Sequence, residues 1–591
     1  MVLPASSKTQ NSELFLYSGI IESHLGKRAS AVALALYNYG RLNIKELAKR
    51  SGLPVVLVKK ALVSLIQLKC VSVWQDSSYK GTTTYYSFRD EGVLLMLYSG
   101  EIIAHIEDIF NDDYFTQIVQ NFLSLGGLST SEYLSSFGTQ DAQTRANIEE
   151  RFTTLVQQQY LIPVKDTHFQ PTKDIWKKTY HNALSKVPKA PMTSELRRTA
   201  EAKAIAKVDF LNLLSNEPEG LYLKDKATLT KRVNPAIPLA FNLQRFLKAR
   251  RTLQLVQLCS HRVGKLTSVI YKQALMLNET NAPDVSDPLL QIGLTNEEVL
   301  YRKDYEPKTG QIFAAKDLVG KLPKDLNLKG SILSGPAKRK ADVDDSSRKR
   351  VKLNGGSYGV PDLNNDDDDD ADDADDDFEL VGSGNSLAIV EQHLKLLTKS
   401  GIPFIKKASG GSYYIPYPDL MSYIKKTVLE SVVTATLGAP SARVLRCVRD
   451  NRLVSEKLIN SVALLREKDA RSLTSVLVKH NLLHIQEVPK SADRAASKSV
   501  FLYRVNDKHC FDTMKNNMCW NMGRLLERGL VLKLENSALV SKINREDVKG
   551  KELEYLLPSE LTQLKKMKDE ELTLAVKMHR LMSLWEIFKL F

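Results

Sequence analysis

The residues of this 591-residue chain that could do chemistry are a histidine pair and a run of aspartates. His480 and His484 are four residues apart, so one helix turn could present both imidazoles to a metal ion, but no third ligand lies nearby. The ten aspartates within 366–377 repel one another, and no glycine or bulky apolar residue among them would shape a metal-binding loop. We therefore expect a buried or turn histidine pair, with no metal and no other cofactor.

The cysteines and the sequence motifs also point away from catalysis. The five cysteines are odd in number, scattered and without a CxxC pair, which favours a reducing compartment over a disulfide framework or a zinc ribbon. The sequence contains no phosphate-cradling GxxxxGK[ST] loop, no GxSxG elbow and no HExxH pair. We expect a protein that is not an enzyme and has no catalytic residues. The cysteines are Cys70, Cys259, Cys447, Cys510 and Cys519.

The charge balance suggests what the chain binds. Its net charge is +14 although the run 366–377 is strongly acidic, so the remainder is more basic still. A basic body favours a nucleic-acid setting through electrostatics that do not depend on base sequence. A basic surface that meets acidic protein partners would give the same composition, and composition alone does not separate the two. No apolar run is long enough to span a bilayer, so we expect no membrane partner.

Two basic clusters separated by a short polar spacer lie in "KRKADVDDSSRKRVKL", residues 338–353. This is a bipartite nuclear-import pattern. The simpler alternative is a solvated charge run, but the surrounding composition predicts an accessible loop, so we favour import and expect a nuclear protein. The import candidates are Lys338, Arg339, Lys340, Arg348, Lys349, Arg350 and Lys352.

Local patterns predict a winged helix near the N-terminus. Asn43 and Glu46 form a reciprocal helix cap, and a second helix begins at Pro54 after a glycine turn. The β-rich runs 71–74 and 83–88 flank a polar loop and predict a hairpin. The candidate residues for DNA binding or protein docking are Lys59 and Lys60 on the second helix and Lys80 in the loop. Because Val58 and Val63 lie beside the lysines, we expect a partly apolar surface, better suited to a protein.

The same helix, helix and hairpin pattern recurs three more times. We expect a mainly α fold with small β-hairpins (α+β) made of four tandem extended winged helices and a C-terminal antiparallel coiled-coil hairpin. The third winged helix is interrupted by an insertion, 278–384, whose composition predicts disorder. The expected units are winged helix 1 at 1–100, winged helix 2 at 101–238, winged helix 3 at 239–425, winged helix 4 at 426–506 and the helical hairpin at 507–591.

This organisation resembles a known family. The opening "ELFLYSGIIESHLGKRASAVALALYNYGRLNIKELAKRSGLPVVLVKKALVSLIQLKCV" and the ending "LPSELTQLKKMKDEELTLAVKMHRLMSLWEIFKLF" are similar to the largest subunit of the three-subunit initiation subcomplex of RNA polymerase III, a relative of the TFIIE alpha subunit. The resemblance implies a non-catalytic subunit that supports promoter opening at tRNA, 5S rRNA and other short non-coding RNA genes. The implied partners are the other two subunits of the heterotrimer, the clamp region of the polymerase core, and promoter DNA near the cleft.

Two other classes of function remain open on the sequence. A free-standing winged-helix transcription regulator would need Arg, Asn or Gln side chains that reach base edges, whereas helix 54–68 offers Lys59, Lys60, Ser64 and Gln67. A scaffold subunit of another large complex would carry a long helical array before a single winged helix. The sequence does not indicate which winged helix contacts DNA and which contacts protein.

Overall fold

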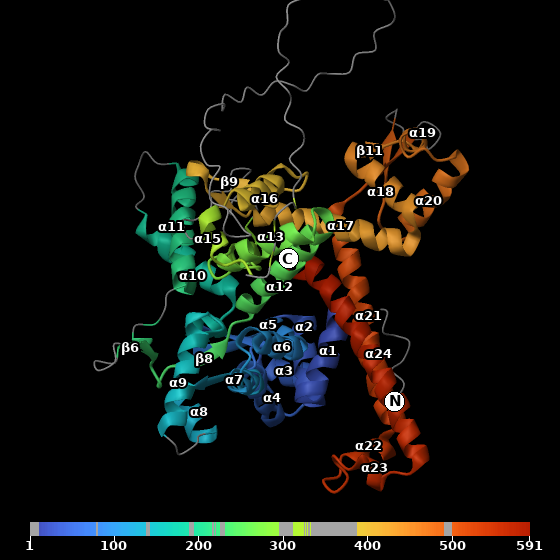
Figure 1. Cartoon of the computed structure of the whole chain (residues 1–591). Coiled ribbons are helices and arrows are strands. Elements are labelled where there is room, and N and C mark those ends of the chain that lie inside the picture. The colour runs from blue at the N-terminus through green and yellow to red at the C-terminus, as the bar shows by residue number, and fades with distance from the viewer. Residues whose placement is uncertain are drawn as a thin grey trace, which may run out of the picture.

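The structure is a computed structural model. Within the residues that it describes, helices dominate and the strands form small antiparallel sheets of two or three strands. The first unit and most of the second lie below the third and fourth, and the C-terminal helices project from the centre (Figure 1). No helix in the described part is both long and apolar enough to cross a membrane. The structure describes residues 11–78, 81–137, 142–187, 194–215, 218, 220–224, 231–294, 311–323, 326, 328, 331, 387–489 and 499–591.

The first unit is a winged helix preceded by two helices. The predicted cap is present, since the Glu46 amide donates to Asn43 Oδ1 (2.9 Å) and the Asn43 amide donates to Glu46 Oε2 (3.0 Å). Its three-stranded sheet has the order β1-β3-β2. The elements are α1 (Ser12–Leu25), α2 (Lys27–Tyr39), β1 (Leu42–Asn43), α3 (Ile44–Ser51), α4 (Val55–Gln67), β2 (Val71–Ser78), β3 (Gly81–Phe88) and α5 (Glu91–Leu97).

The second unit closes its sheet with a strand that is distant in sequence. The short strand that contains Pro163 pairs with β8 (Pro238–Phe241), which lies between β4 and β5. A helical hairpin, α10 and α11, and a small β-hairpin are inserted before β8. The other elements are α6 (Ser99–Phe110), α7 (Asp113–Leu125), β4 (Gly127–Ser129), α8 (Thr130–Phe137), α9 (Ala142–Gln157), β5 (Leu161–Pro163), η2 (Asp166–Phe169), α10 (Thr172–Lys186), α11 (Glu195–Ser215), β6 (Tyr222–Lys224) and β7 (Lys231–Val233).

The third unit includes part of the segment that we expected to be disordered. Phe313 and Leu318 are buried in its core, and Phe313 exchanges backbone hydrogen bonds with Tyr413. The expectation of disorder is therefore wrong for the described residues of 278–384, because scattered apolar side chains there fill the core of this unit. The elements are α12 (Leu243–Arg262), α13 (Lys265–Leu277), α14 (Pro288–Gln291), α15 (Ala315–Val319), α16 (Leu387–Lys399), β9 (Lys406–Lys407), η4 (Ser409–Gly411) and β10 (Tyr413–Tyr414).

The fourth unit shares a helix with the third. The N-terminal half of α17 packs in the core of the third unit through Leu420 and Ile424, and its C-terminal half packs in the other large core through Leu429 and Val433. The sheet of this unit has the order β11-β13-β12. The elements are α17 (Tyr417–Leu437), α18 (Ala439–Asn451), β11 (Leu453–Val454), α19 (Glu456–Val462), α20 (Glu467–Lys479), β12 (His484–Pro489) and β13 (Ser499–Arg504).

The C-terminal residues form the expected helical hairpin, against which α1 also packs. Gly523 makes this close approach possible, since a Cβ there would lie 2.4 Å from Phe15 Cδ1. The C-terminal end of α24 lies in the centre of the molecule. Trp585 is fully buried there, in a core shared by the first, second and fourth units. The hairpin consists of α21 (Asp507–Glu535), α22 (Ser537–Ile543), α23 (Glu552–Tyr555) and α24 (Pro558–Lys589).

A buried polar cluster joins several of these units beside Trp585. Glu586 of α24 accepts hydrogen bonds from Arg250 and Gln254 of α12. The hydroxyl of Tyr98, which precedes α6, also donates to Glu586, at a distance of 3.5 Å. Arg250 also pairs with Glu101 of α6 at 3.1 Å. Burial raises the pKa of Glu586, although Arg250 acts in the opposite direction. The third unit, the C-terminal helix and the junction of the first two units are thus held together by one charged cluster.

Candidate docking and nucleic-acid interface

The solvent face of α4 carries the two sequence-predicted lysines. Lys59 and Lys60 are exposed, and neither forms an ion pair with any residue that the structure describes. Val56 (65% exposed) and Val63 (64%) flank them. The expectation for Val58 is wrong, because Val58 lies on the core face of α4 and is fully buried. The exposed face is therefore both apolar and basic, with Val56 in the place that we assigned to Val58.

The other predicted site residues lie outside the described part of the chain. Lys80 falls in the gap between β2 and β3. The import candidates Lys338, Arg339, Lys340, Arg348, Lys349, Arg350 and Lys352, and the aspartates of 366–377, are also outside it.

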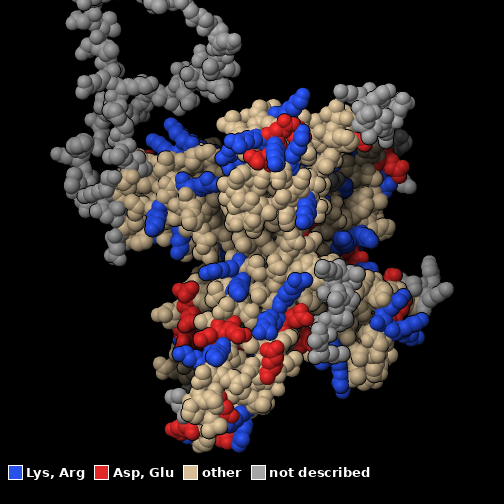
Figure 2. Space-filling view, turned by 90° about the vertical axis from the view of Figure 1, so that its right-hand side faces the viewer, with Lys and Arg blue, Asp and Glu red and all other residues tan. Residues whose placement is uncertain are grey.

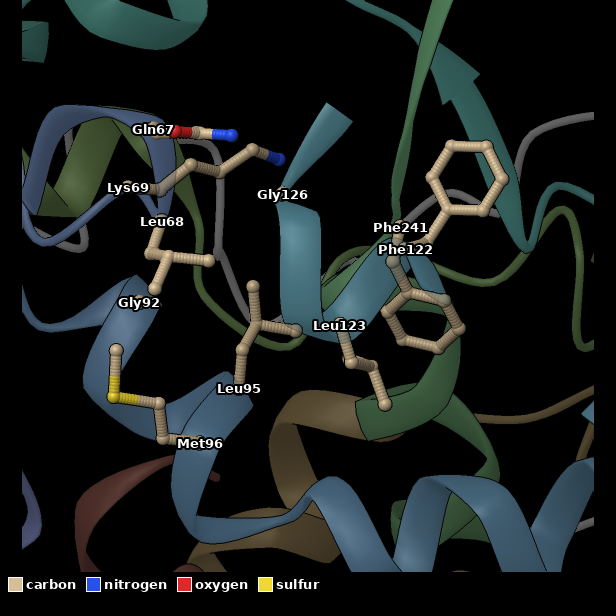
Figure 3. A pocket seen from close by; sticks show the side chains of 10 residues that line it. All are labelled: Gln67, Leu68, Lys69, Gly92, Leu95, Met96, Phe122, Leu123, Gly126 and Phe241. Atoms are coloured by element: carbon tan, nitrogen blue, oxygen red, sulfur yellow. The ribbon is translucent and has the colours of Figure 1, made fainter. Parts of the chain in front are cut away.

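The C-terminal end of α4 is occupied by the second unit. Gln67 Nε2 donates a hydrogen bond to the Leu125 carbonyl (2.6 Å), and Gly126 lies directly against the Gln67 carbonyl. Gly126 has a φ of 85°, a conformation that favours glycine. Figure 3 shows the cavity beside this contact, lined from both units. At about 20 Å³ it has room for one water molecule, so it is no ligand site. The part of α4 that is open to a partner is therefore the exposed face from Val56 to Val63, before the contact at Gln67.

The fourth unit presents an apolar surface that the sequence pattern did not reveal. Leu458 (40% exposed), Val462 (50%) and Leu464 (83%) follow one another along α19 and the turn after it. Leu464 has a φ of 51°, which is uncommon for a side chain of this kind. On the wing strands, Ile485 and Phe501 are each about half exposed. The spacing of Leu458 and Val462 fits a buried helix face and a docking surface equally well.

The face of the molecule with the fourth unit and the hairpin has mixed charge. Figure 2 shows Lys and Arg side chains interspersed with Asp and Glu over this face. Part of this charge is internally paired: Arg471 of α20 bonds to Glu456 and Glu467. Such a surface lacks the single-sign stripe that tracks a nucleic-acid backbone.

The residues singled out for chemistry have structural surroundings. His480 caps the end of α20, and the ring of His484 packs 4.7 Å from that of His509, not against His480. Burial, followed by the nearby His509, lowers the pKa of His484. The part of the chain that is described holds no group of three or more potential metal ligands.

The cysteines are buried and have no disulfide partner within the described chain. Burial raises the pKa of Cys70, Cys259 and Cys519 to about 12 and that of Cys510 to about 11. Since the thiolate is the reactive form, these side chains act as apolar core residues.

Comparison with known proteins identifies families along most of the chain. Residues 15–76 match the RNA polymerase III subunit RPC82 helix-turn-helix domain, and residues 150–424 match RNA polymerase III subunit RPC82. Residues 429–505 match the POLR3C C-terminal winged-helix domain. Residues 538–589 match the helical hairpin domain of DNA-directed RNA polymerase III subunit RPC3.

Curated relatives match over nearly the full length. The proteins named DNA-directed RNA polymerase III subunit RPC3 from Kluyveromyces lactis, Eremothecium gossypii and Candida albicans are 40%, 39% and 36% identical to the chain. Each match covers 99% of this chain and 94%, 96% and 98% of the respective relative. The resemblance that the two ends of the sequence suggested is confirmed. The chain belongs to the RPC3/RPC82 family of RNA polymerase III subunits.

Proposed function

We propose that the chain is a non-catalytic subunit of RNA polymerase III that acts in transcription initiation, mainly by docking on other proteins. Its relatives are named as subunits of this polymerase and match it over nearly their whole length. The observation that carries the docking role is the exposed face of α4, where Val56 and Val63 are each about two-thirds exposed beside Lys59 and Lys60. Desolvating such a face stabilises a protein contact, whereas DNA phosphates offer no apolar surface to cover it.

The finer assignments follow from the family resemblance and remain part of this proposal. The chain joins the other two subunits of a heterotrimer, is seated at the clamp region of the core, and lies near promoter DNA at the cleft. It supports promoter opening at genes for tRNA, 5S rRNA and other short non-coding RNAs. Any DNA contact by Lys59, Lys60 or Lys80 is to the backbone and positions the duplex without reading bases.

A nuclear location follows from the same role, and the basic clusters at 338–340 and 348–352 are proposed as the import signal. The runner-up function, a free-standing winged-helix regulator, requires base-reading side chains on α4. The α4 face offers valines and lysines there, and its Gln67 is engaged with Leu125 of the second unit.

Copurification tests the proposed function. The full-length chain, tagged and expressed in its own cells, is expected to retain both large catalytic subunits of RNA polymerase III through washes of rising salt. The control is the same tag on an unrelated nuclear protein. Retention of DNA fragments alone, or of a different complex without polymerase, would overturn the proposal in favour of the regulator or scaffold alternative.

A further inference from the structure

The exposed face of α4 has an apolar centre with a lysine on each side. At about 100° per residue, Val56 and Val63 lie almost in line along the helix, and Lys59 and Lys60 lie about 50° to either side of that line. All four side chains are exposed, the two valines by 65% and 64%. Val56 and Val63 are about 10 Å apart along the helix axis, which is about two turns. The face therefore has the size and the pattern that two turns of another helix would cover.

The lysines of this face have no acidic partner in the described part of the chain. Neither Lys59 nor Lys60 forms an ion pair or a side-chain hydrogen bond with any residue there. The one carboxylate on α3 and α4 belongs to Glu46, and it is taken up in the helix cap, where Oε2 accepts a hydrogen bond from the Asn43 amide (3.0 Å). The positive charge of this face is therefore open to neutralisation by a binding partner.

The two valines decide between an acidic protein segment and nucleic acid as that partner. A recognition helix in the major groove directs hydrogen-bonding side chains at base edges, whereas the centre of this face consists of Val56 and Val63. Phosphates would pair with the lysines but leave both valines in water. The end of α4 is also closed to a groove, because Gln67 Nε2 donates to the Leu125 carbonyl of the second unit.

We propose that this face of α4 binds an acidic amphipathic helix of another RNA polymerase III subunit. Apolar side chains of the partner pack against Val56 and Val63, and carboxylates on both edges of its apolar stripe pair with Lys59 and Lys60. Both edges must be acidic, because the lysines flank both sides of the valines. The inference rests on the proposed function and names the chemistry of the partner at its docking surface.

Photo-crosslinking in the assembled polymerase tests the inference. Benzoylphenylalanine replaces Val55 in the tagged full-length chain, since Val55 is 40% exposed beside the face and its replacement keeps both central valines. In the control it replaces His181, exposed on α10. The polymerase is isolated and irradiated, and adducts are mapped by mass spectrometry. We expect about tenfold more adduct at Val55 than at His181, in one segment of another subunit with apolar residues at helical spacing and carboxylates on both edges. A yield at Val55 no higher than at His181 overturns the proposal, as do adducts to nucleic acid, to a segment without such carboxylates or to this chain itself.

Charge reversal gives a second readout. Lys59→Glu with Lys60→Glu is expected to lower the yield of the Val55 adduct about tenfold, and Lys substitutions of the carboxylates in the mapped segment are expected to restore it. The matched control is Lys177→Glu with Lys178→Glu, an adjacent exposed pair on α10, which changes the net charge equally and should leave the yield unchanged. An unchanged yield for the α4 pair, or an equal loss for both pairs, overturns the proposal.

The same preparation separates this inference from the proposed function. The unsubstituted chain must retain both large catalytic subunits of the polymerase. If it does not, the proposed function itself fails. Retention of the polymerase without a Val55 adduct is a different result, because it overturns the assignment of a partner to α4 and leaves the chain a polymerase subunit.

Discussion

Glu586 of α24 and Arg250 of α12 form a two-point ion pair, with Nε–Oε2 and Nη2–Oε1 distances of 3.1 and 3.2 Å, although 336 residues separate them in the sequence. Glu586 is fully buried. This pair fixes the last turns of the C-terminal helix against the third unit, while Tyr98 and Glu101 bring the junction of the first two units to the same cluster. The relative placement of these units thus depends on a few buried charges.

Glu586→Gln should loosen this junction. The substitution keeps the shape but removes the charge that faces Arg250, and breaking a buried pair costs roughly 3 kcal/mol. We expect a lower thermal transition of the full chain and faster hydrogen exchange in the last turns of α24. Glu570→Gln is the control, because Glu570 and its partner Arg528 are both more than half exposed. Equal effects of the two substitutions would contradict the role of Glu586.

The acid stability of the docked α1 should depend on Glu13. Burial acts to raise its pKa, but Lys589 and Lys515 prevail and lower it below the ordinary 4.5. A lowered folded-state pKa contributes stability that is present above the ordinary value and disappears as the pH falls through the folded value. The stability difference between wild type and Glu13→Gln should therefore shrink as the pH falls from about 6 to about 3. Urea unfolding at a series of pH values measures this difference in the free energy of unfolding. A difference that stays constant from about pH 6 to about pH 3 would contradict the role of Glu13.

Gly523→Ala should separate α1 from the hairpin. The added Cβ would lie 2.4 and 2.5 Å from two carbons of the Phe15 ring, so the ring must move, at a cost of roughly 1–3 kcal/mol. Gly529→Ala in the same helix is the control: nothing lies within 4 Å of its Cβ, and Ala favours a helix over Gly by about 1 kcal/mol. The denaturant concentration at the midpoint of unfolding should fall for Gly523→Ala and rise for Gly529→Ala. A shift in the same direction would mean that the Phe15 contact is not tight.

The exposed face of α4 should matter more for assembly than for DNA. Val63→Asp, and separately Lys59→Ala with Lys60→Ala, should weaken retention of the chain on an immobilised polymerase core, because both alter the proposed docking surface. DNA affinity of the full chain should change little, and equally for promoter and random duplexes. If the lysines instead bind phosphates, the slope of log affinity against log salt should fall by about one for each lysine–phosphate pair that is removed. Weaker binding to promoter DNA alone, with intact assembly, would revive the regulator hypothesis.

Deleting residues 336–382 should reduce the nuclear accumulation of the chain without destabilising its folded units. The deletion removes both basic clusters but keeps Leu328, which is fully buried, and Ser331, whose Oγ lies 2.9 Å from His393 Nε2. Fluorescence of the tagged chain in cells measures the first effect and its thermal transition the second. A matched variant with the seven import candidates changed to Ser, and the rest of the segment kept, should show the same reduction in accumulation. Unaltered accumulation of both would rule out the import assignment.

Local chemistry in the sequence determined much of the architecture. The Asn43–Glu46 cap, the hairpin after α4 and the two long helices of the C-terminal hairpin depend on neighbours within a few residues, so their patterns predicted the elements observed. Family membership, too, was recognisable from the two ends of the chain. Helix periodicity does not by itself say which of two adjacent apolar faces is covered. For this reason it placed Val58 on the surface, where the structure buries it.

Only the tertiary structure decided the long-range pairings. The partner strand of β5 lies beyond an inserted helical hairpin, and Phe313 completes the third core from within a segment of poor apolar pattern. Glu586 and Glu13 are charged residues within largely apolar stretches of α24 and α1, and only the packing of distant elements buries Glu586 and leaves Glu13 13% exposed. Burial and ion pairing depend on contacts between residues hundreds of positions apart, and no local pattern contains that information.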